Sequence, residues 1–129
     1  LTPDSTLNGM SGTAAYTGEA AGTLWSAAGG TDLTGTFVCD VNFDDGSVAG
    51  FNMSVYGGGN SATISGASGN LDKGEFELQG GQWQLDGQTP DHQHAVGSLY
   101  GPQADHMGGA WQMQAQDQAA TGVFSGDKQ

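Results

Sequence analysis

Three histidines are the side chains in this chain best suited to bind a ligand. His92 and His94 lie two residues apart in the segment 90–94, PDHQH. In an extended segment both imidazoles point to one face, where they can meet one metal ion or one haem edge. His106 lies in a Gly-Pro turn and joins them only if the fold brings that turn close. The three residues are candidates for a haem or transition-metal site, and the alternative is that they are exposed loop histidines.

Acidic residues offer a second set of ligand atoms. Asp44 and Asp45, with Asn42, supply oxygens of the kind that divalent cations such as calcium prefer, but the twelve-residue calcium-loop pattern is missing. Turn chemistry alone also explains these residues. Glu75 and Glu77 share one face of an extended segment, where acidic side chains usually provide solubility and protect a sheet edge.

Catalytic motifs are absent from the sequence. No nucleophile stands beside an evident base, and neither a Gly-x-Ser-x-Gly elbow nor a phosphate-binding loop occurs. The residues Trp25, Trp83 and Trp111 either line a ligand pocket or pack in the core and around an open end. We therefore expect a binding or structural protein and not an enzyme.

A β-hairpin over 33–56 is the clearest element that positions these residues. Apolar and polar residues alternate on both arms, the period of a half-buried strand, so Cys39 is expected to point inward. A three-residue loop, 44–46, brings the two apolar sets to one face, with Gly46 in the left-handed conformation of a bulged turn. That register predicts the cross-strand pairs Phe37–Met53, Cys39–Phe51 and Val41–Ala49.

Short strands separated by glycine-rich turns follow along the rest of the chain. The 24 glycines and 3 prolines disfavour helices and favour turns and barrel bends. His92 and His94 are expected in a polar loop before the strand 95–100, and the strand spacing suits an all-β barrel. The other expected strands are 12–18, 22–26, 62–66, 75–80, 83–87, 111–115 and 120–125.

The charge balance restricts the partners. Fourteen acidic residues stand against two lysines, a formal net charge of -12. Such a surface cannot release counterions from phosphates, so nucleic acid is excluded as a partner and an anionic membrane face is disfavoured. No segment has the apolar length of a transmembrane helix, and we do not expect a transmembrane protein. The acidity serves solubility, a basic partner or divalent cations.

Two further features concern processing and redox state. Residues 1–4 lack the basic and apolar regions of a signal peptide, so we expect a mature or excised segment. Cys39 is the only cysteine, which excludes an internal disulfide, so sheet pairing and the core must hold the fold.

The C-terminal quarter carries a resemblance to a known family. Gly101, Pro102, Ala104, Gly108 and Gly109 match a turn of the form G-P-x-A-x-x-x-G-G, and the segment 122–126, GVFSG, follows near the end of the chain. Both resemble the closing strands of the β-barrels of transferrin-binding protein B. The hairpin around 40–46 is similar to a strand pair of the same family.

The resemblance implies a fold, a location and a function. It implies a single domain, residues 1–129, folded as an antiparallel eight-stranded up-and-down β-barrel with glycine-rich turns. It also implies a non-enzymatic protein at the extracellular or outer-membrane surface of a Gram-negative bacterium, binding a protein or small-molecule ligand for haem or iron acquisition. The lack of arginine and of a second lobe weakens direct transferrin binding. The alternative is a structural or adhesive subunit of an extracellular assembly.

Overall fold

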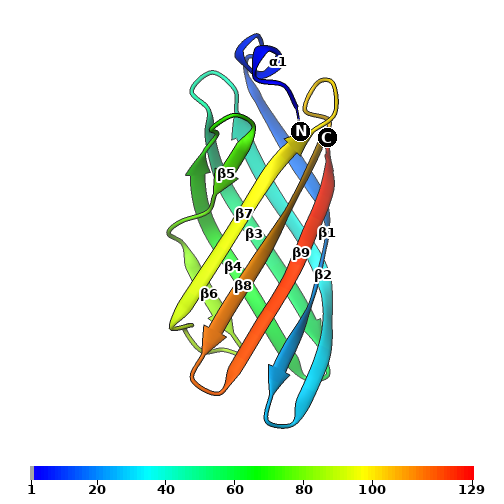
Figure 1. Cartoon of the computed structure of the whole chain (residues 1–129), viewed down its shortest axis with the longest axis vertical. Helices are drawn as coiled ribbons and strands as arrows, with labels where there is room; N and C mark the ends of the chain where they lie inside the picture. Colours follow the sequence, from blue (N-terminus) through cyan, green and yellow to red (C-terminus); the bar gives the residue numbers. More distant parts are fainter. Residues whose placement is uncertain (1) are drawn as a thin grey trace.

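The computed structural model describes residues 2–129 and consists mostly of β-strands (Figure 1). A short helix, α1 (Asp4–Asn8), lies at the end of the molecule that also holds the C-terminus (Figure 1); we call this the helix end and the opposite end the far end. The described residues contain no helix long and apolar enough to span a membrane. The strands found in residues 2–129 are β1 (Thr13–Ser26), β2 (Gly29–Asn42), β3 (Ser47–Gly57), β4 (Asn60–Asn70), β5 (Glu75–Glu77), β6 (Gln82–Leu85), β7 (His92–Tyr100), β8 (His106–Ala115) and β9 (Gln118–Lys128).

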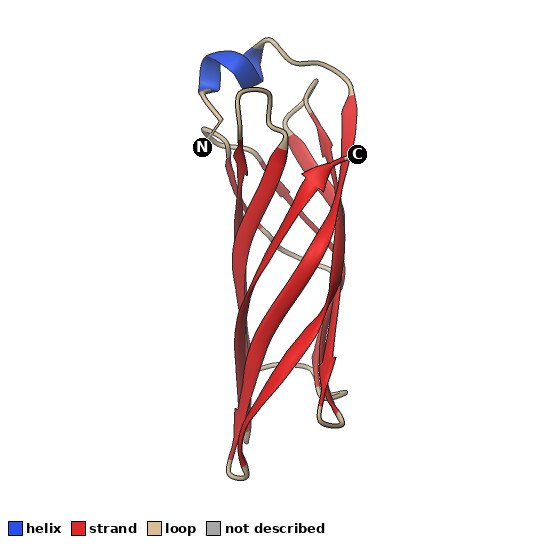
Figure 2. Ribbon diagram, turned by 90° about the vertical axis from the view of Figure 1, so that its right-hand side faces the viewer, coloured by secondary structure: helices blue, strands red, loops and turns tan. Residues whose placement is uncertain are grey.

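These strands form one antiparallel sheet that curls into an elongated barrel (Figure 2). The order across the sheet is β5-β7-β8-β9-β1-β2-β3-β4-β6, so most neighbours in space are also neighbours in the chain. The expected all-β antiparallel barrel is confirmed. Residues 2–129 contain nine strands and not eight, because the chain segment 75–85 that closes the barrel is split into β5 and β6.

Aromatic rings fill the middle of the barrel. Phe37, Phe51 and Phe124 come from β2, β3 and β9, and each is almost fully buried. The ring centroid of Phe124 lies 4.9 Å from that of Phe37 and 5.0 Å from that of Phe51. Such aromatic pairs contribute about 0.5–1.5 kcal/mol each beyond the burial of their surface. The alternating pattern of the sequence therefore builds the core that it predicts.

Strand β1 is longer than the sequence suggests. The two strands expected at 12–18 and 22–26 form one continuous strand, Thr13–Ser26, so their separation was wrong. Gly22 does not break the strand, because it pairs with Gly122 of β9 and the indole of Trp111 lies over both glycines. A Cβ at Gly122 would lie 2.7 Å from the Trp111 ring, so the missing side chains make room for the indole.

The hairpin of β2 and β3 follows the expected register over part of its length. Phe37 pairs with Met53, Cys39 is buried and Gly46 has a φ of 75°, as predicted. The expected pair Val41–Ala49 is wrong: Val41 pairs with Val48, which is buried, while Ala49 is exposed. The register shifts between Val38 and Asp40, where Gly50 opposite adopts a φ of 62° and permits a β-bulge.

The Gly-Pro turn closes the helix end over the core. Ala104 in this turn has a φ of 55° and is completely buried. The hydroxyl of Tyr16 on β1 donates a hydrogen bond of 2.6 Å to the Ala104 carbonyl oxygen. Thr2 is also buried and donates its hydroxyl to the Gly101 carbonyl oxygen over 2.9 Å. These contacts fix the turn to strand β1 and to the N-terminal segment.

Candidate functional site

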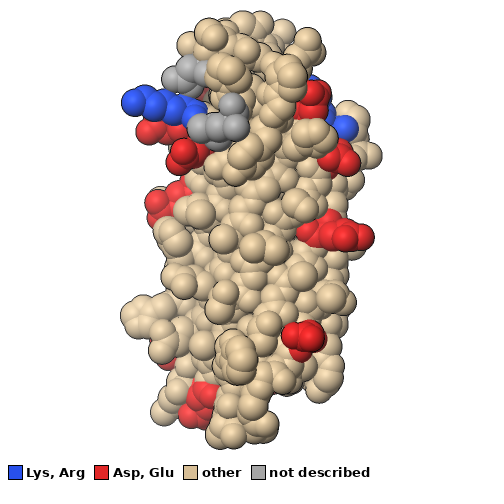
Figure 3. All heavy atoms as spheres, turned by 45° about the vertical axis from the view of Figure 1, so that its right-hand side comes forward, with Lys and Arg blue, Asp and Glu red and all other residues tan. Residues whose placement is uncertain are grey.

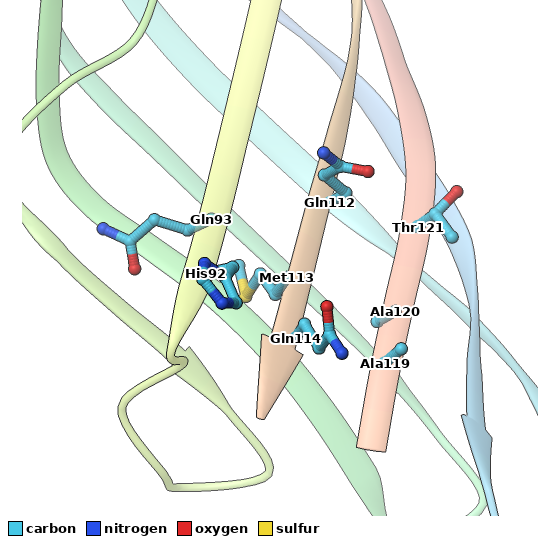
Figure 4. Close-up of a pocket in the computed structure, with 8 residues that line it drawn as sticks. All are labelled: His92, Gln93, Gln112, Met113, Gln114, Ala119, Ala120 and Thr121. Carbon is cyan, nitrogen blue, oxygen red and sulfur yellow. The ribbon is translucent and has the colours of Figure 1, made fainter. Parts of the chain in front are cut away.

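His92 and His94 lie on the same outer face of the barrel. Both belong to strand β7 and not to a loop, and both side chains are exposed (Figure 4 shows His92). The Nδ1 atom of His94 is 3.6 Å from the Oε1 atom of Glu77 on the neighbouring strand β5. The extended backbone therefore directs the two imidazoles to the same face of the strand.

His106 lies at the opposite end of the same pair of strands. It is the first residue of β8 and pairs with Tyr100, the last residue of β7, whereas His92 is the first residue of β7. The Nδ1 atom of His106 is 2.6 Å from Asp127 Oδ1. The length of β7 separates His106 from the other two histidines, so the three cannot share one ligand. Among residues 2–129, no group of three or more His, Cys, Asp or Glu side chains is arranged to hold a metal ion.

A small hollow lies beside His92 near the far end. Its volume is about 220 Å³, below the range of about 300–1,000 Å³ that is usual for ligand pockets. Met113 and Ala120 contribute buried side chains, and Gln112 and Gln114 are exposed at the same place (Figure 4). A haem bound by His92 and His94 would therefore lie on the surface of the barrel and not within it.

Asp44 and Asp45 are used within the turn between β2 and β3. The Oδ1 atom of Asp44 accepts a hydrogen bond of 3.1 Å from the Gly12 amide, and Asp45 Oδ1 accepts one of 2.9 Å from the Ser47 amide. Hydrogen bonds from Ser47 lower the pKa of Asp45 below its usual value. These contacts are those of the turn explanation, and a divalent cation at these residues stays a prediction.

The tryptophans divide between the core and the surface. Trp83 and Trp111 are buried, and the Trp83 indole donates a hydrogen bond of 2.7 Å to the Gly80 carbonyl oxygen. Trp25 is 56% exposed and covers Gly30 at the far end of β1 and β2. Two of the three indoles therefore serve packing, and the third is available to a partner.

A further candidate site is a sparsely charged surface over four neighbouring strands. We call the outward-facing side chains of β7, β8, β9 and β1 the outer wall. One row across it runs through Val96, Ala110, Val123 and Ala21, which pair in succession from strand to strand. Val96 is 38% and Val123 60% exposed. The exposed apolar row has no counterpart among the sites expected from the sequence.

Charge is sparse on this wall although the chain is strongly acidic. Its outward positions carry two carboxylates, Glu19 and Asp127, together with the three histidines. Figure 3 shows one face of the molecule, on which acidic side chains lie scattered around a broad uncharged surface. Shallow hollows lie along the wall, one of about 240 Å³ beside Val96 and Ala110. Small residues and low charge let a partner approach closely.

The sequence contains a signal for this wall that strand periodicity alone conceals. Strict alternation would place a polar residue after each buried one, yet the strands contain the apolar pairs 95–96, 110–111 and 123–124. One member of each pair is buried, and the other faces out. Apolar residues at both parities of an otherwise alternating strand indicate exposed apolar side chains, and the same pattern also exposes Val38 on β2 and Tyr56 on β3.

Comparison with known proteins shows which proteins this barrel is similar to. The family described as the C-lobe and N-lobe β-barrels of transferrin-binding protein B matches residues 8–128. A search of curated protein sequences gave no significant match. Among solved structures, transferrin-binding protein B from serogroup B Neisseria meningitidis is similar, with a TM-score of 0.68 and 16% identity, over 99% of this chain and 27% of that one.

Two further structures share the fold. A mutant of transferrin-binding protein B from Haemophilus parasuis gives a TM-score of 0.66 with 13% identity, over 98% of this chain and 28% of that one. HpuA from Kingella denitrificans, solved in complex with human haemoglobin, gives a TM-score of 0.57 with 19% identity, over 99% of this chain and 47% of that one. The chain thus spans about a quarter of the transferrin-binding protein B structures. It belongs to the family of the C-lobe and N-lobe β-barrels of transferrin-binding protein B.

Proposed function

We propose that this domain is a non-enzymatic binding module at a Gram-negative bacterial surface, and that it captures a protein carrying iron or haem. Family membership supports the class of function, because the similar structures include a transferrin-binding protein and a protein solved with human haemoglobin. The observation that carries the proposal is the outer wall. It offers a sparsely charged face of small, apolar and uncharged polar residues in a chain with a net charge of -12.

The wall shares its low charge with the centre of a protein interface. Charged residues are depleted at such centres, while aromatic residues are enriched. Val123, the most exposed of the large apolar residues, lies in the middle strand pair of the wall, and Tyr100 and Trp25 lie toward its two ends. A partner that covers this row removes apolar surface from water at about 25 cal/mol per Å².

The acidic surface around the wall selects the charge of the partner. Both lysines lie at the helix end, because Lys73 follows β4 and Lys128 ends β9. The other charged side chains of the chain are carboxylates, which attract a partner with a basic rim and repel an acidic one. Association is therefore expected to slow as the salt concentration rises.

The test is a binding titration with iron-loaded transferrin and with human haemoglobin. We expect one of them to bind the parent domain saturably, and we expect Val123→Glu to weaken that binding at least about tenfold, or about 1.4 kcal/mol. Val38→Glu is the matched control, because Val38 is 43% exposed on β2, outside the wall. Failure of both carriers to bind, or equal losses in the two variants, would contradict the proposal.

The second candidate function is a structural or adhesive subunit. The observation that favours it is the same sparsely charged wall, because it is a face on which two acidic copies can approach with little repulsion. Native mass spectrometry separates the two functions. Dimers or larger species that disappear in Val123→Glu support the subunit, whereas a monomer that binds a carrier supports capture.

A further inference from the structure

The segment that closes the barrel loses its pairing with β7 at a pair of glycines. Gly80 and Gly81 have φ values of 69° and 75°, in the left-handed region. A Cβ at Gly81 would collide with the Ser65 carbonyl oxygen and lie 2.8 Å from the Ala67 amide nitrogen. Only glycine fits there without a shift of the backbone. Before the kink the segment pairs on both sides, β5 with β7 and Gln79 with Ser68 of β4, whereas after it β6 pairs with β4 alone.

This loss of pairing leaves two strand edges facing each other. The last hydrogen bond between the segment and β7 joins the Leu78 amide to the Ala95 carbonyl oxygen, over 2.9 Å. Beyond it, β6 pairs with β4 alone, and the stretch 92–94 of β7 pairs with β8 alone. Within the described residues no ladder joins β6 to β7. We call this opening near the far end the seam.

The hydrogen-bonding direction of each strand identifies the groups that face the seam. On β7, the Leu99 amide donates to the Gly74 carbonyl oxygen and the Ala95 carbonyl oxygen accepts from the Leu78 amide, both on the side of β5. Every second residue of a strand directs its peptide groups to the same side, so the peptide groups of Gln93 also point to that side. On β6, Asp86 donates to the Ser61 carbonyl oxygen on the side of β4. The peptide groups of Trp83 therefore point away from β4, into the seam.

The side chains beside the seam are polar and uncharged or weakly basic. Gln82 and Gln84 are exposed on β6, and His92, Gln93 and His94 are exposed on β7. The two edges do not pair with each other in the part of the chain that the structure describes. Of the residues whose peptide groups point into the seam, Gln93 is exposed and Trp83 is buried. An extended chain can satisfy the N–H and C=O groups of an exposed edge residue such as Gln93 by adding a strand to the sheet.

Charge determines which extended chain fits. The ionised groups next to the seam are the carboxylates of Glu77 on β5, Asp86 directly after β6 and Asp91 directly before β7, while both lysines lie at the helix end. A second copy of this chain would bring more carboxylates to the seam and is disfavoured. A segment with lysine or arginine is attracted instead.

We propose that the seam binds an extended, basic segment of a partner protein, which adds as a strand along the free edge of β7. Its backbone pairs with the peptide groups of Gln93, and its lysine or arginine side chains reach the surrounding carboxylates. This site is distinct from the exposed apolar row of the outer wall, so its test is independent of carrier capture.

The probe is an acetylated and amidated pentapeptide of sequence KVTVK, added to the isotope-labelled domain in low salt. We expect saturable NMR shifts centred on the amides of Trp83, Gln93 and Ala95. The same peptide with N-methylated valines, which cannot complete the ladder, and the peptide EVTVE are expected to bind at least about tenfold more weakly. Shifts that are absent, spread evenly over the barrel, or equal for the three peptides overturn the proposal.

Two variants separate backbone pairing from side-chain contacts. Gln93→Ala keeps the peptide N–H and is expected to bind KVTVK as the parent does, whereas Gln93→Pro removes that N–H and is expected to lose binding. The HSQC spectrum of each variant shows whether the barrel is intact. Unchanged binding by a folded Gln93→Pro contradicts the proposal, and the comparison with the N-methylated peptide decides the matter if that variant does not fold.

Discussion

Removing one hydroxyl group tests how the helix end of the barrel is held. Tyr16 is completely buried on β1, and its hydroxyl donates to the carbonyl oxygen of Ala104 over 2.6 Å. Tyr16→Phe keeps the ring and the packing of the core. It removes the hydrogen-bond donor to the carbonyl oxygen of Ala104, a residue that is itself fully buried and has a φ of 55°.

The loss follows from the cost of an unpaired buried carbonyl. A polar group left without a partner in the interior costs about 1–3 kcal/mol. For a domain of 129 residues, 1 kcal/mol corresponds to about 4 °C in Tm, so Tyr16→Phe is expected to lower Tm by about 4–12 °C. Tyr100→Phe is the matched control, because Tyr100 is 42% exposed on β7 and its loss should stay within about 0.5 kcal/mol.

Calorimetry and urea unfolding of the parent and both variants measure the difference. The urea slope should be the same for the three proteins, because each unfolds the same barrel. A loss below about 0.5 kcal/mol for Tyr16→Phe, or equal losses for the two variants, would show that the hydrogen bond does not hold the turn.

Three further predictions follow from buried and exposed side chains. Cys39 is 1% exposed and should react with thiol reagents only as fast as the barrel opens; labelling at the rate of a free thiol would contradict its inward position. Burial raises the pKa of both Cys39 and Tyr16 to about 12 from 9.0 and 10.0. As the pH rises, the unfolded chain loses these two protons before the folded chain does. The contribution of the two groups to the free energy of unfolding should therefore be complete below about pH 9 and decrease between pH 9 and pH 12, and Tyr16→Phe should reduce the upper part of that decrease. A free energy of unfolding that stays constant over this range in the parent would contradict the raised pKa of both groups. If His92 and His94 bind haem or a transition metal, replacing both by alanine should abolish the Soret shift or the metal uptake and change the free energy of unfolding by no more than about 0.5 kcal/mol. A parent that does not bind either ligand, or a double variant that still binds, would contradict this site.

The strands with strict alternation could be predicted from the sequence. The inward position of Cys39 and the Phe37–Met53 pair follow from a period of two, which leaves one choice of face. The true partner of Val41 could not be predicted, because the bulge at Gly50 shifts the register by one residue and breaks the expected pair Val41–Ala49. The sequence around a glycine in a strand does not show whether a β-bulge forms there.

Glycines that pack against distant residues also limited the prediction. Gly22 looked like a strand boundary, but it lies inside β1 because Trp111, far away in the sequence, occupies its missing side-chain space. Local composition predicted a break between two strands, but tertiary packing determines that the strand continues.

The candidate site was predicted in its parts but not in its arrangement. His92 and His94 share a face, as their spacing indicates, but which end of the barrel His106 occupies depends on the pairing of β7 with β8. The outer wall requires the register of four strands, which brings Val96, Ala110 and Val123 into one row.

The most direct test of the central claim is a cross-saturation NMR measurement on the deuterated domain, with iron-loaded transferrin and with human haemoglobin as unlabelled partners. The account predicts that one of these carriers transfers saturation to the amides of Val96, Ala110 and Val123 and leaves that of Val38 unaffected. Transfer from neither carrier, or transfer confined to β2 and β3, would contradict the assignment of the outer wall as the surface that captures an iron or haem carrier.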